Sequence, residues 1–273
     1  MTLLVLGDCH ASWSMLIDAI DVAVARHGVT AVIQVGDFGF FPLYFPLLEK
    51  MLINRPFRVP VHVIEGNHED HAWLWAQAAD GAFNRWAKEF NLIVHRRGDV
   101  ASVAGITVGF LGGALHADRS QHGSTAKGTT NWVTNREADR AALAFNATSI
   151  DLMVTHSCPH SIGVGIHGSA ELFLAVERYI QAKGFDGGPY DDCGEPALVR
   201  LWKKLERSPK SWVFGHFHTH REAEVGETVF RCVGSIDGSD GRNAPLGYIL
   251  NPGNWTWETV ELSVLKPTQG LKP

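Results

Sequence analysis

Residues 3–10 read LLVLGDCH, an apolar run that ends in a carboxylate and an imidazole. Four consecutive apolar residues followed by glycine are typical of a buried β-strand that stops at a turn. Asp8 and His10 are two positions apart, and in an extended chain such residues share one side. This stretch therefore predicts a strand whose carboxyl end presents two metal-binding side chains.

The same arrangement recurs further along the chain. Apolar runs at 31–35, 61–64, 150–155 and 212–214 lead in turn to Asp37, Asn67, His156, and His216 with His218. Ligand sites in open α/β sheets collect at the carboxyl ends of strands, so we expect the five strand ends to meet at one edge. Each motif taken alone is more often a turn, a helix cap or a surface histidine, and the prediction depends on their occurring together.

The combined donor set contains two carboxylates, one amide oxygen and four imidazoles. Such nitrogen and oxygen ligands suit a pair of divalent transition-metal ions that remain open to water and substrate. The two oxygens of the Asp37 carboxylate allow this residue to bridge two ions. The predicted chemistry is hydrolysis of a phosphate ester.

Strand-like and helical patterns alternate along the chain, which indicates an α/β layered fold. Strands are expected at 3–6, 31–35, 61–64, 106–111, 150–155 and 212–214, and helices at 14–26 and 70–90. Three further strands, at 228–233, 247–250 and 255–262, are expected to form a second sheet packed on the first. Two long polar or glycine-rich stretches, 116–131 and 184–194, are expected to border the substrate pocket.

The chain has the composition of an ordinary globular protein, with 273 residues, 45% hydrophobic residues and a net charge of −5. We expect a single domain over 1–265 and a flexible tail over 266–273. The negative charge does not favour a nucleic-acid partner, and no apolar run is long enough for a membrane. The cysteines show no CxxC spacing and the first apolar run is too short for a leader, so we expect a cytoplasmic protein.

These motifs resemble those of the calcineurin-like metallophosphoesterase superfamily, whose pattern is DxH, GD, GNH(D/E), H and GHxH. All five blocks are present between residues 8 and 218. The resemblance implies a four-layer αββα sandwich of two mixed β-sheets flanked by helices. It also implies two divalent metal ions, for which manganese is favoured and iron, zinc, cobalt or nickel are suitable. The implied roles are Asp8, His10 and His218 on one ion, Asn67, His156 and His216 on the other, Asp37 as the bridge and His68 as the general acid.

The second block departs from that of the superfamily's protein phosphatases, which reads GDxxDRG. Residues 36–41 read GDFGFF here, so the arginine that clamps a dianionic phosphate is missing. We therefore expect a phosphodiesterase acting on small or nucleotide-like diesters, cyclic nucleotides included. The alternatives are a phosphomonoesterase of the same fold, a DNA or RNA nuclease, and a non-catalytic protein-binding scaffold, against which the intact ligand set argues.

Two features close to the motifs leave alternatives open. The aromatic cluster just after Asp37 could stack a nucleobase, although packing in the core or a contact between subunits is the commoner role for such a cluster. It comprises Phe38, Phe40, Phe41, Tyr44 and Phe45. The acidic pair that follows His68, at positions 69 and 70, could orient its imidazole. The second of the pair is more often the cap of the helix that follows.

Overall fold

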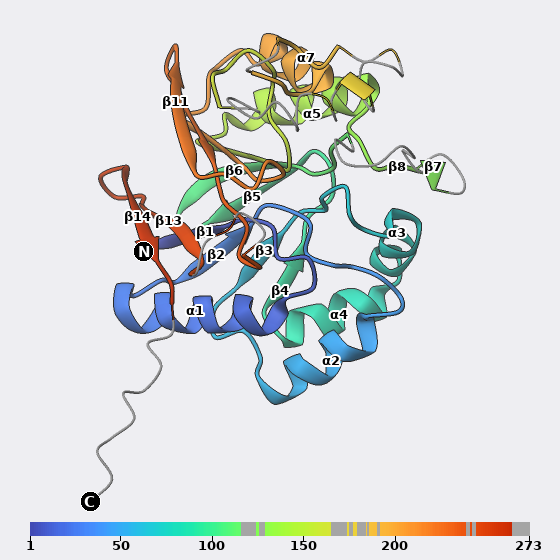
Figure 1. Ribbon diagram of the computed structural model, residues 1–273, viewed down its shortest axis with the longest axis vertical. Helices are drawn as coiled ribbons and strands as arrows, with labels where there is room; N and C mark the ends of the chain where they lie inside the picture. The colour runs from blue at the N-terminus through green and yellow to red at the C-terminus, as the bar shows by residue number, and fades with distance from the viewer. Residues whose placement is uncertain are drawn as a thin grey trace, which may run out of the picture.

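The computed structural model describes residues 1–115, 124–125, 129–164, 174, 177–178, 184, 186–189, 192–238, 241 and 244–263. Within these residues, two six-stranded β-sheets face each other and helices cover their outer sides (Figure 1). The layers are thus helix, sheet, sheet and helix. The expected αββα sandwich of two mixed sheets is confirmed.

The first sheet has the strand order β14-β13-β1-β2-β3-β4. Its strands are β1 (Leu3–Leu6), β2 (Ala31–Gln34), β3 (Val61–Val63), β4 (Leu92–Val94), β13 (Leu246–Asn251) and β14 (Thr256–Glu261). Strands β1 to β4 are parallel, whereas β13 is antiparallel to β1 and β14 is antiparallel to β13. The carboxyl ends of the four parallel strands therefore lie at one edge of the sheet.

The second sheet has the order β11-β12-β10-β9-β6-β5. Its strands are β5 (Asp99–Val103), β6 (Ile106–Leu111), β9 (Leu152–Thr155), β10 (Ser211–Phe214), β11 (Arg221–Val225) and β12 (Thr228–Cys232). The four central strands are parallel, and the outer strands β5 and β11 are antiparallel to their neighbours. A separate short ribbon pairs β7 (Ser124–Thr125) with β8 (Thr129–Thr130).

Six helices of the described chain cover the two sheets: α1 (Trp13–His27), α2 (Phe45–Asn54), α3 (His71–Ala79), α4 (Gly81–Glu89), α5 (Asn135–Thr148) and α7 (Pro196–Lys204). The first four pack on the first sheet, and α5 and α7 pack on the second (Figure 1). Along β1 the side chains alternate, so that Leu4 and Leu6 face the helices while Leu3 and Val5 face the other sheet. Each sheet is therefore covered on both faces, and its central strands are largely apolar.

Two of the predicted elements differ from the structure. The helix expected over 70–90 is two helices, because Asp80 adopts an extended conformation and its carboxylate accepts a hydrogen bond from the backbone N–H of Ala82 to cap α4. The last three predicted strands do not share one sheet. β12 joins the second sheet, whereas β13 pairs with β1 and carries β14 to the edge of the first sheet.

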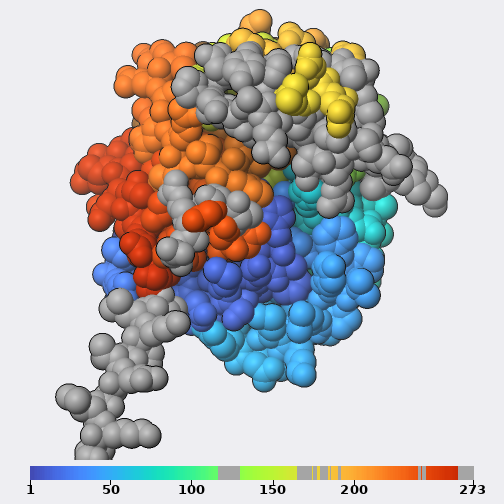
Figure 2. Space-filling model, in the orientation of Figure 1, coloured from blue at the N-terminus to red at the C-terminus, as the bar shows by residue number. Residues whose placement is uncertain are grey.

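A segment early in the chain lies beside a segment from late in the chain. Figure 2 shows blue N-terminal segments beside orange segments from the region of residues 210–240. The backbone N–H of Ile236 donates to the carbonyl oxygen of Asp8 at 2.8 Å.

None of the helices that the structure describes has the length and apolar character needed to span a bilayer. The tail expected over 266–273, most of the loop 116–131, and residues 185, 190 and 191 of the loop 184–194 lie outside the described residues, so the tail and the border of the substrate pocket stay predictions.

A buried pair of histidines links the two sheets. His62 Nδ1 lies 2.8 Å from His95 Nε2, and the His95 ring stacks on Phe110 of β6 with centroids 3.7 Å apart. Burial lowers the pKa of His62 to about 4, and burial together with His62 lowers the pKa of His95 to about 3. Both imidazoles are therefore neutral in the folded protein near neutral pH.

This pair should make the fold sensitive to mild acid. In the unfolded chain both imidazoles bind protons below their ordinary pKa of about 6.5. Protons therefore favour the unfolded chain below that pH. The free energy of unfolding keeps its full value above about pH 6.5 and decreases as the pH falls toward the lowered pKa values. Phenylalanine has a ring that cannot titrate. Between about pH 7.5 and about pH 5, the free energy of unfolding of His95→Phe should therefore fall by on the order of 2 kcal/mol less than that of the wild type.

Urea unfolding at the two pH values measures this difference. The control is His27→Gln, which removes a partly exposed imidazole at the end of α1. An equal loss of stability in the wild type and in His95→Phe would contradict the assignment.

Candidate metal centre

The predicted ligands come together where the carboxyl ends of the two sheets meet. Asp8, Asp37 and Asn67 follow β1, β2 and β3 of the first sheet, whereas His156 and His216 follow β9 and β10 of the second. The site therefore lies across the junction of the two sheets. Convergence of five strand ends at one edge is what parallel strands impose.

One group of donors consists of Asp8, His10 and His218. His218 Nε2 lies 3.1 Å from Asp8 Oδ2 and 3.1 Å from His10 Nε2. The ligand atoms of the three residues lie within 4.8 Å of one another. Donors this close can share the coordination shell of a single ion.

A second group is centred on His156. Its Nε2 atom lies 3.0 Å from Asn67 Oδ1 and 3.3 Å from Asp37 Oδ2. The His216 ring lies beside it, with ring centroids 5.1 Å apart. Asp37 Oδ2 is also 4.0 Å from His10 Nδ1, so the Asp37 carboxylate reaches both groups, as a bridging ligand must.

The orientation of His156 leaves one nitrogen free for a metal. Its Nδ1 atom lies 2.8 Å from the carbonyl oxygen of Val35, which can only accept a hydrogen bond. Nδ1 must therefore carry the proton in the neutral ring, and the lone pair of Nε2 points at Asn67 and Asp37. The backbone directly after β2 thus selects the tautomer that can bind a cation.

The backbone at the ligands is not the extended chain that the sequence pattern suggested. His10, Asp37, His216 and His218 all have positive φ, at 44°, 52°, 68° and 48°. Left-handed backbone is uncommon for such residues and costs roughly 1 kcal/mol or more each, so it persists only where the surroundings impose it. Tight turns after the strands, rather than strand alternation, bring Asp8 next to His10.

Two glycines are required by the close approach of the carboxylates. A Cβ atom on Gly66 would overlap Asp37 Oδ1 and its backbone nitrogen, and a Cβ atom on Gly215 would overlap Asp8 Oδ1. The same carboxylates accept backbone hydrogen bonds, from His68 to Asp37 at 2.7 Å and from His216 to Asp8 at 3.1 Å. Both acids are therefore fixed by backbone on two sides.

The centre concentrates buried negative charge. Asp8 and Asp37 are 0% and 1% exposed. Burial alone would raise the pKa of both carboxyl groups, yet the neighbouring His156 lowers the pKa of each below its ordinary value. Although burial opposes it, the two carboxylates in turn raise the pKa of His156 to about 10. Two buried carboxylates need positive charge beside them, and divalent metal ions fit that need and the donor set.

His68 lies at the edge of the centre, and the centroid of its ring is 5.6 Å from the centroid of the His10 ring. The two acidic residues that follow it have different roles. Asp70 caps α3 by accepting from the backbone N–H of Trp73 at 2.9 Å, as expected. The buried carboxylate of Glu69 accepts hydrogen bonds from three successive backbone N–H groups of residues 38–40. Glu69 therefore fixes the loop after Asp37, a role that the sequence did not indicate.

The residues of the aromatic cluster after Asp37 have two roles. Phe38 and Phe40 are buried and stack on each other with centroids 4.6 Å apart, and Phe45 packs against Trp86. Phe41 and Tyr44 instead line a cavity of about 380 Å³ that also contains His10 and His68. Core packing is confirmed for the first three, and the last two border the centre.

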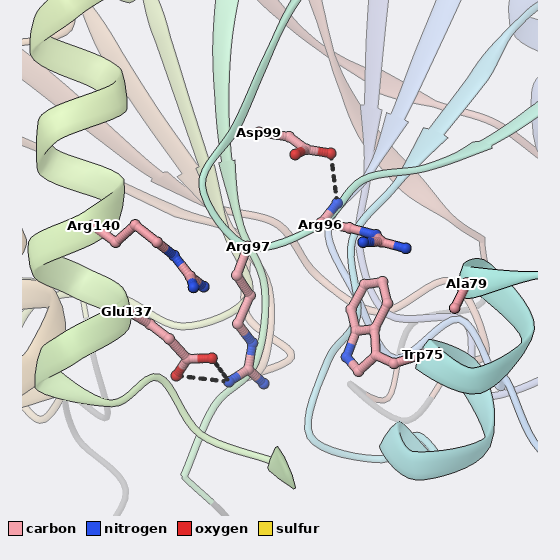
Figure 3. Close-up of a pocket in the computed structure, with 7 residues that line it drawn as sticks. All are labelled: Trp75, Ala79, Arg96, Arg97, Asp99, Glu137 and Arg140. Carbon is pink, nitrogen blue, oxygen red and sulfur yellow. Dashed lines mark hydrogen bonds and ion pairs between the residues drawn. The ribbon is translucent and has the colours of Figure 1, made fainter. Parts of the chain in front are cut away.

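Arg97 supports the loop that carries Asn67, and sequence reasoning missed it. Its guanidinium binds Glu65 at 2.6 Å and Glu137 of α5 at 3.1 Å, and it donates to the carbonyl oxygens of Thr130 and Trp132. Figure 3 shows Arg97 reaching Glu137, at one side of a cavity lined also by Trp75, Ala79, Arg96, Asp99 and Arg140. The one sequence signal was an acid, Glu65, directly after the apolar run that forms β3.

Comparisons with known proteins agree with this architecture. The family model for calcineurin-like phosphoesterases matches residues 1–220. A crystal structure of a Thermus thermophilus protein is similar to the chain, with 11% identity, a TM-score of 0.61, and coverage of 96% of this chain and 99% of that one. A dimetal phosphatase from Danio rerio is similar with 12% identity, a TM-score of 0.54, and coverage of 96% and 99%. The search of curated proteins found no match.

The glycine constraint predicts a selective defect in metal binding. Gly66→Ala should weaken Mn²⁺ affinity by roughly 10-fold to 100-fold, because the added methyl displaces Asp37. The measurement is a calorimetric titration with MnCl₂ of protein from which metal ions have first been removed with a chelator. Gly81→Ala, where the new methyl meets only the flexible end of Arg85, is the matched control and should bind as the wild type does. Equal affinity in Gly66→Ala and the wild type would be evidence against the site.

Proposed function

The chain belongs to the calcineurin-like phosphoesterase family and is a metal-dependent phosphoester hydrolase, and on this premise we propose that it acts on small phosphodiesters. Nucleotide-like diesters, cyclic nucleotides included, are the class we favour. The two solved structures compared share only 11% and 12% identity with the chain, so they bear on its fold and not on its substrate. The substrate has to be inferred from the residues around the centre.

The observation that supports a diester is the charge of the cavity beside the metal centre. Its described lining consists of His10, Ala11, Gly39, Phe41, Leu43, Tyr44 and His68, and it contains no lysine, arginine or carboxylate. A phosphomonoester dianion is best bound by a guanidinium that makes two parallel hydrogen bonds. A diester carries one negative charge and has less need of a guanidinium, and the apolar part of this cavity can receive one of its two ester substituents.

The proposed roles of the ligands follow the two groups of donors. We assign Asp8, His10 and His218 to one ion, Asn67, His156 and His216 to the other, and Asp37 to both. When bound, the two ions activate water and polarise a phosphoryl oxygen as Lewis acids. Mn²⁺ is the metal we favour, although this mixed nitrogen and oxygen donor set also suits iron, zinc, cobalt and nickel.

His68 is the proposed general acid. Its side chain lines the cavity together with that of His10. Its backbone N–H donates a hydrogen bond to the carboxylate of Asp37, the proposed bridging ligand, so the backbone of His68 is held next to the metal centre. As the bond from phosphorus to the leaving oxygen breaks, the imidazolium donates its proton to that oxygen and the alcohol leaves neutral.

We also propose a reducing compartment such as the cytoplasm, because all four cysteines are buried and free.

A direct comparison of two chromogenic substrates tests the diester proposal. With added MnCl₂, kcat/KM for bis-p-nitrophenyl phosphate should exceed that for p-nitrophenyl phosphate by roughly tenfold or more, because the monoester dianion lacks a cationic partner. Asp37→Ala should abolish both activities. Faster turnover of the monoester would favour the phosphomonoesterase alternative, and rapid digestion of single-stranded oligonucleotides would favour the nuclease.

The role of His68 predicts a dependence on the leaving group. His68→Ala should lower kcat by about 10²-fold to 10³-fold for an alkyl ester, whose alkoxide needs a proton, and much less for a p-nitrophenyl ester. Its metal content, measured by elemental analysis, should equal that of the wild type. A uniform loss of rate across both esters would show that His68 acts through the structure of the site and not as an acid.

A further inference from the structure

We propose that the cavity beside His68 is a leaving-group subsite for an aromatic alcohol, with Tyr44 and Phe41 as its specificity-determining residues. This inference rests on the proposed function, because it takes His68 to be the group that protonates the leaving oxygen. It goes further by naming the chemical class of the alcohol that is released.

The position of the cavity decides which part of the substrate enters it. His68 and His10 lie on one wall, so an ester oxygen within reach of the His68 imidazole has its substituent inside the same space. A proton donor must lie within hydrogen-bond distance of the oxygen that leaves. The alcohol that departs, and not the part of the diester that stays on phosphorus, therefore occupies the cavity.

The walls of the cavity are apolar and aromatic. Phe41 and Tyr44 meet edge to face with centroids 5.7 Å apart, and Leu43 completes the outer rim. Leu43 is 80% exposed and Tyr44 is 45% exposed, so both present apolar surface that a ligand ring can cover. The volume of about 380 Å³ is within the range of small-ligand pockets.

The backbone behind these side chains is held firmly. The Glu69 carboxylate binds the N–H groups of residues 38–40, and Trp13 Nε1 donates to the carbonyl oxygen of Phe38 at 2.8 Å. Gly39 has φ of 102° and packs so closely on Ala11 that any Cβ atom would clash with it. The turn that follows is closed by the N–H of Tyr44 on the carbonyl oxygen of Phe41 at 3.0 Å. Phe41 and Tyr44 therefore extend from a fixed base.

This chemistry selects a flat apolar group over a charged or small one. The described lining offers no charged partner for a second phosphate or a carboxylate, and its imidazoles are used by the metal centre and by acid catalysis. An aromatic ring gains contact with two aromatic side chains at little cost in polar desolvation. An aryl or nucleobase-bearing alcohol is thus the expected leaving group.

The test compares two diesters of equal charge whose leaving alcohols have similar acidity, methyl phenyl phosphate and methyl hexafluoroisopropyl phosphate. The wild type with MnCl₂ should prefer the phenyl ester. Tyr44→Ala should lower kcat/KM for the phenyl ester roughly tenfold, mainly through KM, and change that for the fluoroalkyl ester less than twofold. Tyr44→Phe, which keeps the ring, should restore the preference. Leu47→Ala removes an exposed apolar side chain of α2 outside the cavity and is the matched control.

The outcomes separate this inference from the proposed function. Equal losses for both esters in Tyr44→Ala, or no loss for either, would overturn the subsite while leaving the hydrolase intact. If the wild type hydrolyses neither ester, the diesterase proposal fails, and calorimetry with phenylphosphonate and methylphosphonate on the Mn²⁺-loaded protein then decides about the cavity. Tighter binding of phenylphosphonate that is lost in Tyr44→Ala would support the subsite. Equal affinity, or binding of neither, would overturn it.

Discussion

Two carboxylates buried at the junction of two β-sheets are the constraint on which the rest of this structure depends. Asp8 and Asp37 have almost no contact with solvent, and charges of the same sign in such a place must be balanced by cations. The surroundings are arranged for that purpose. Backbone N–H groups fix the carboxylates, glycines let them approach, and the Val35 carbonyl turns His156 so that Nε2 faces them.

The layered packing supplies the rigidity that this cluster needs. Parallel strands in both sheets end at the same edge, so the turns that follow them meet without long connections. Two buried acids outside the ligand set then hold those turns in place. Glu69 binds the loop after Asp37, while Glu65, through Arg97, ties the loop of Asn67 to α5 on the second sheet. Left-handed backbone at four of the proposed ligands is tolerated because these contacts leave little alternative.

The surroundings of the centre are asymmetric in charge. The metal-binding side is strongly polar, whereas the cavity that adjoins His68 is walled by Phe41, Leu43 and Tyr44. Here the residues after Asp37 replace the charged clamp of the protein phosphatases with aromatic side chains, so selectivity is expected from shape and ring contact rather than from recognition of charge.

The sequence by itself determined the layered α/β class and the strands that lead to the site, and it predicted the seven proposed donors, because periodicity and ligand chemistry are local properties. It did not determine that β13 and β14 return to the first sheet, since strand partners are chosen by packing between distant residues. Nor did it indicate the break at Asp80, the positive φ of His10, or the roles of Glu69 and Arg97. Only the tertiary structure decided these. The strand order, Glu69 and Arg97 depend on partners far away in the chain, whereas the positive φ of His10 and the cap at Asp80 are backbone conformations that hydrophobic periodicity does not reveal.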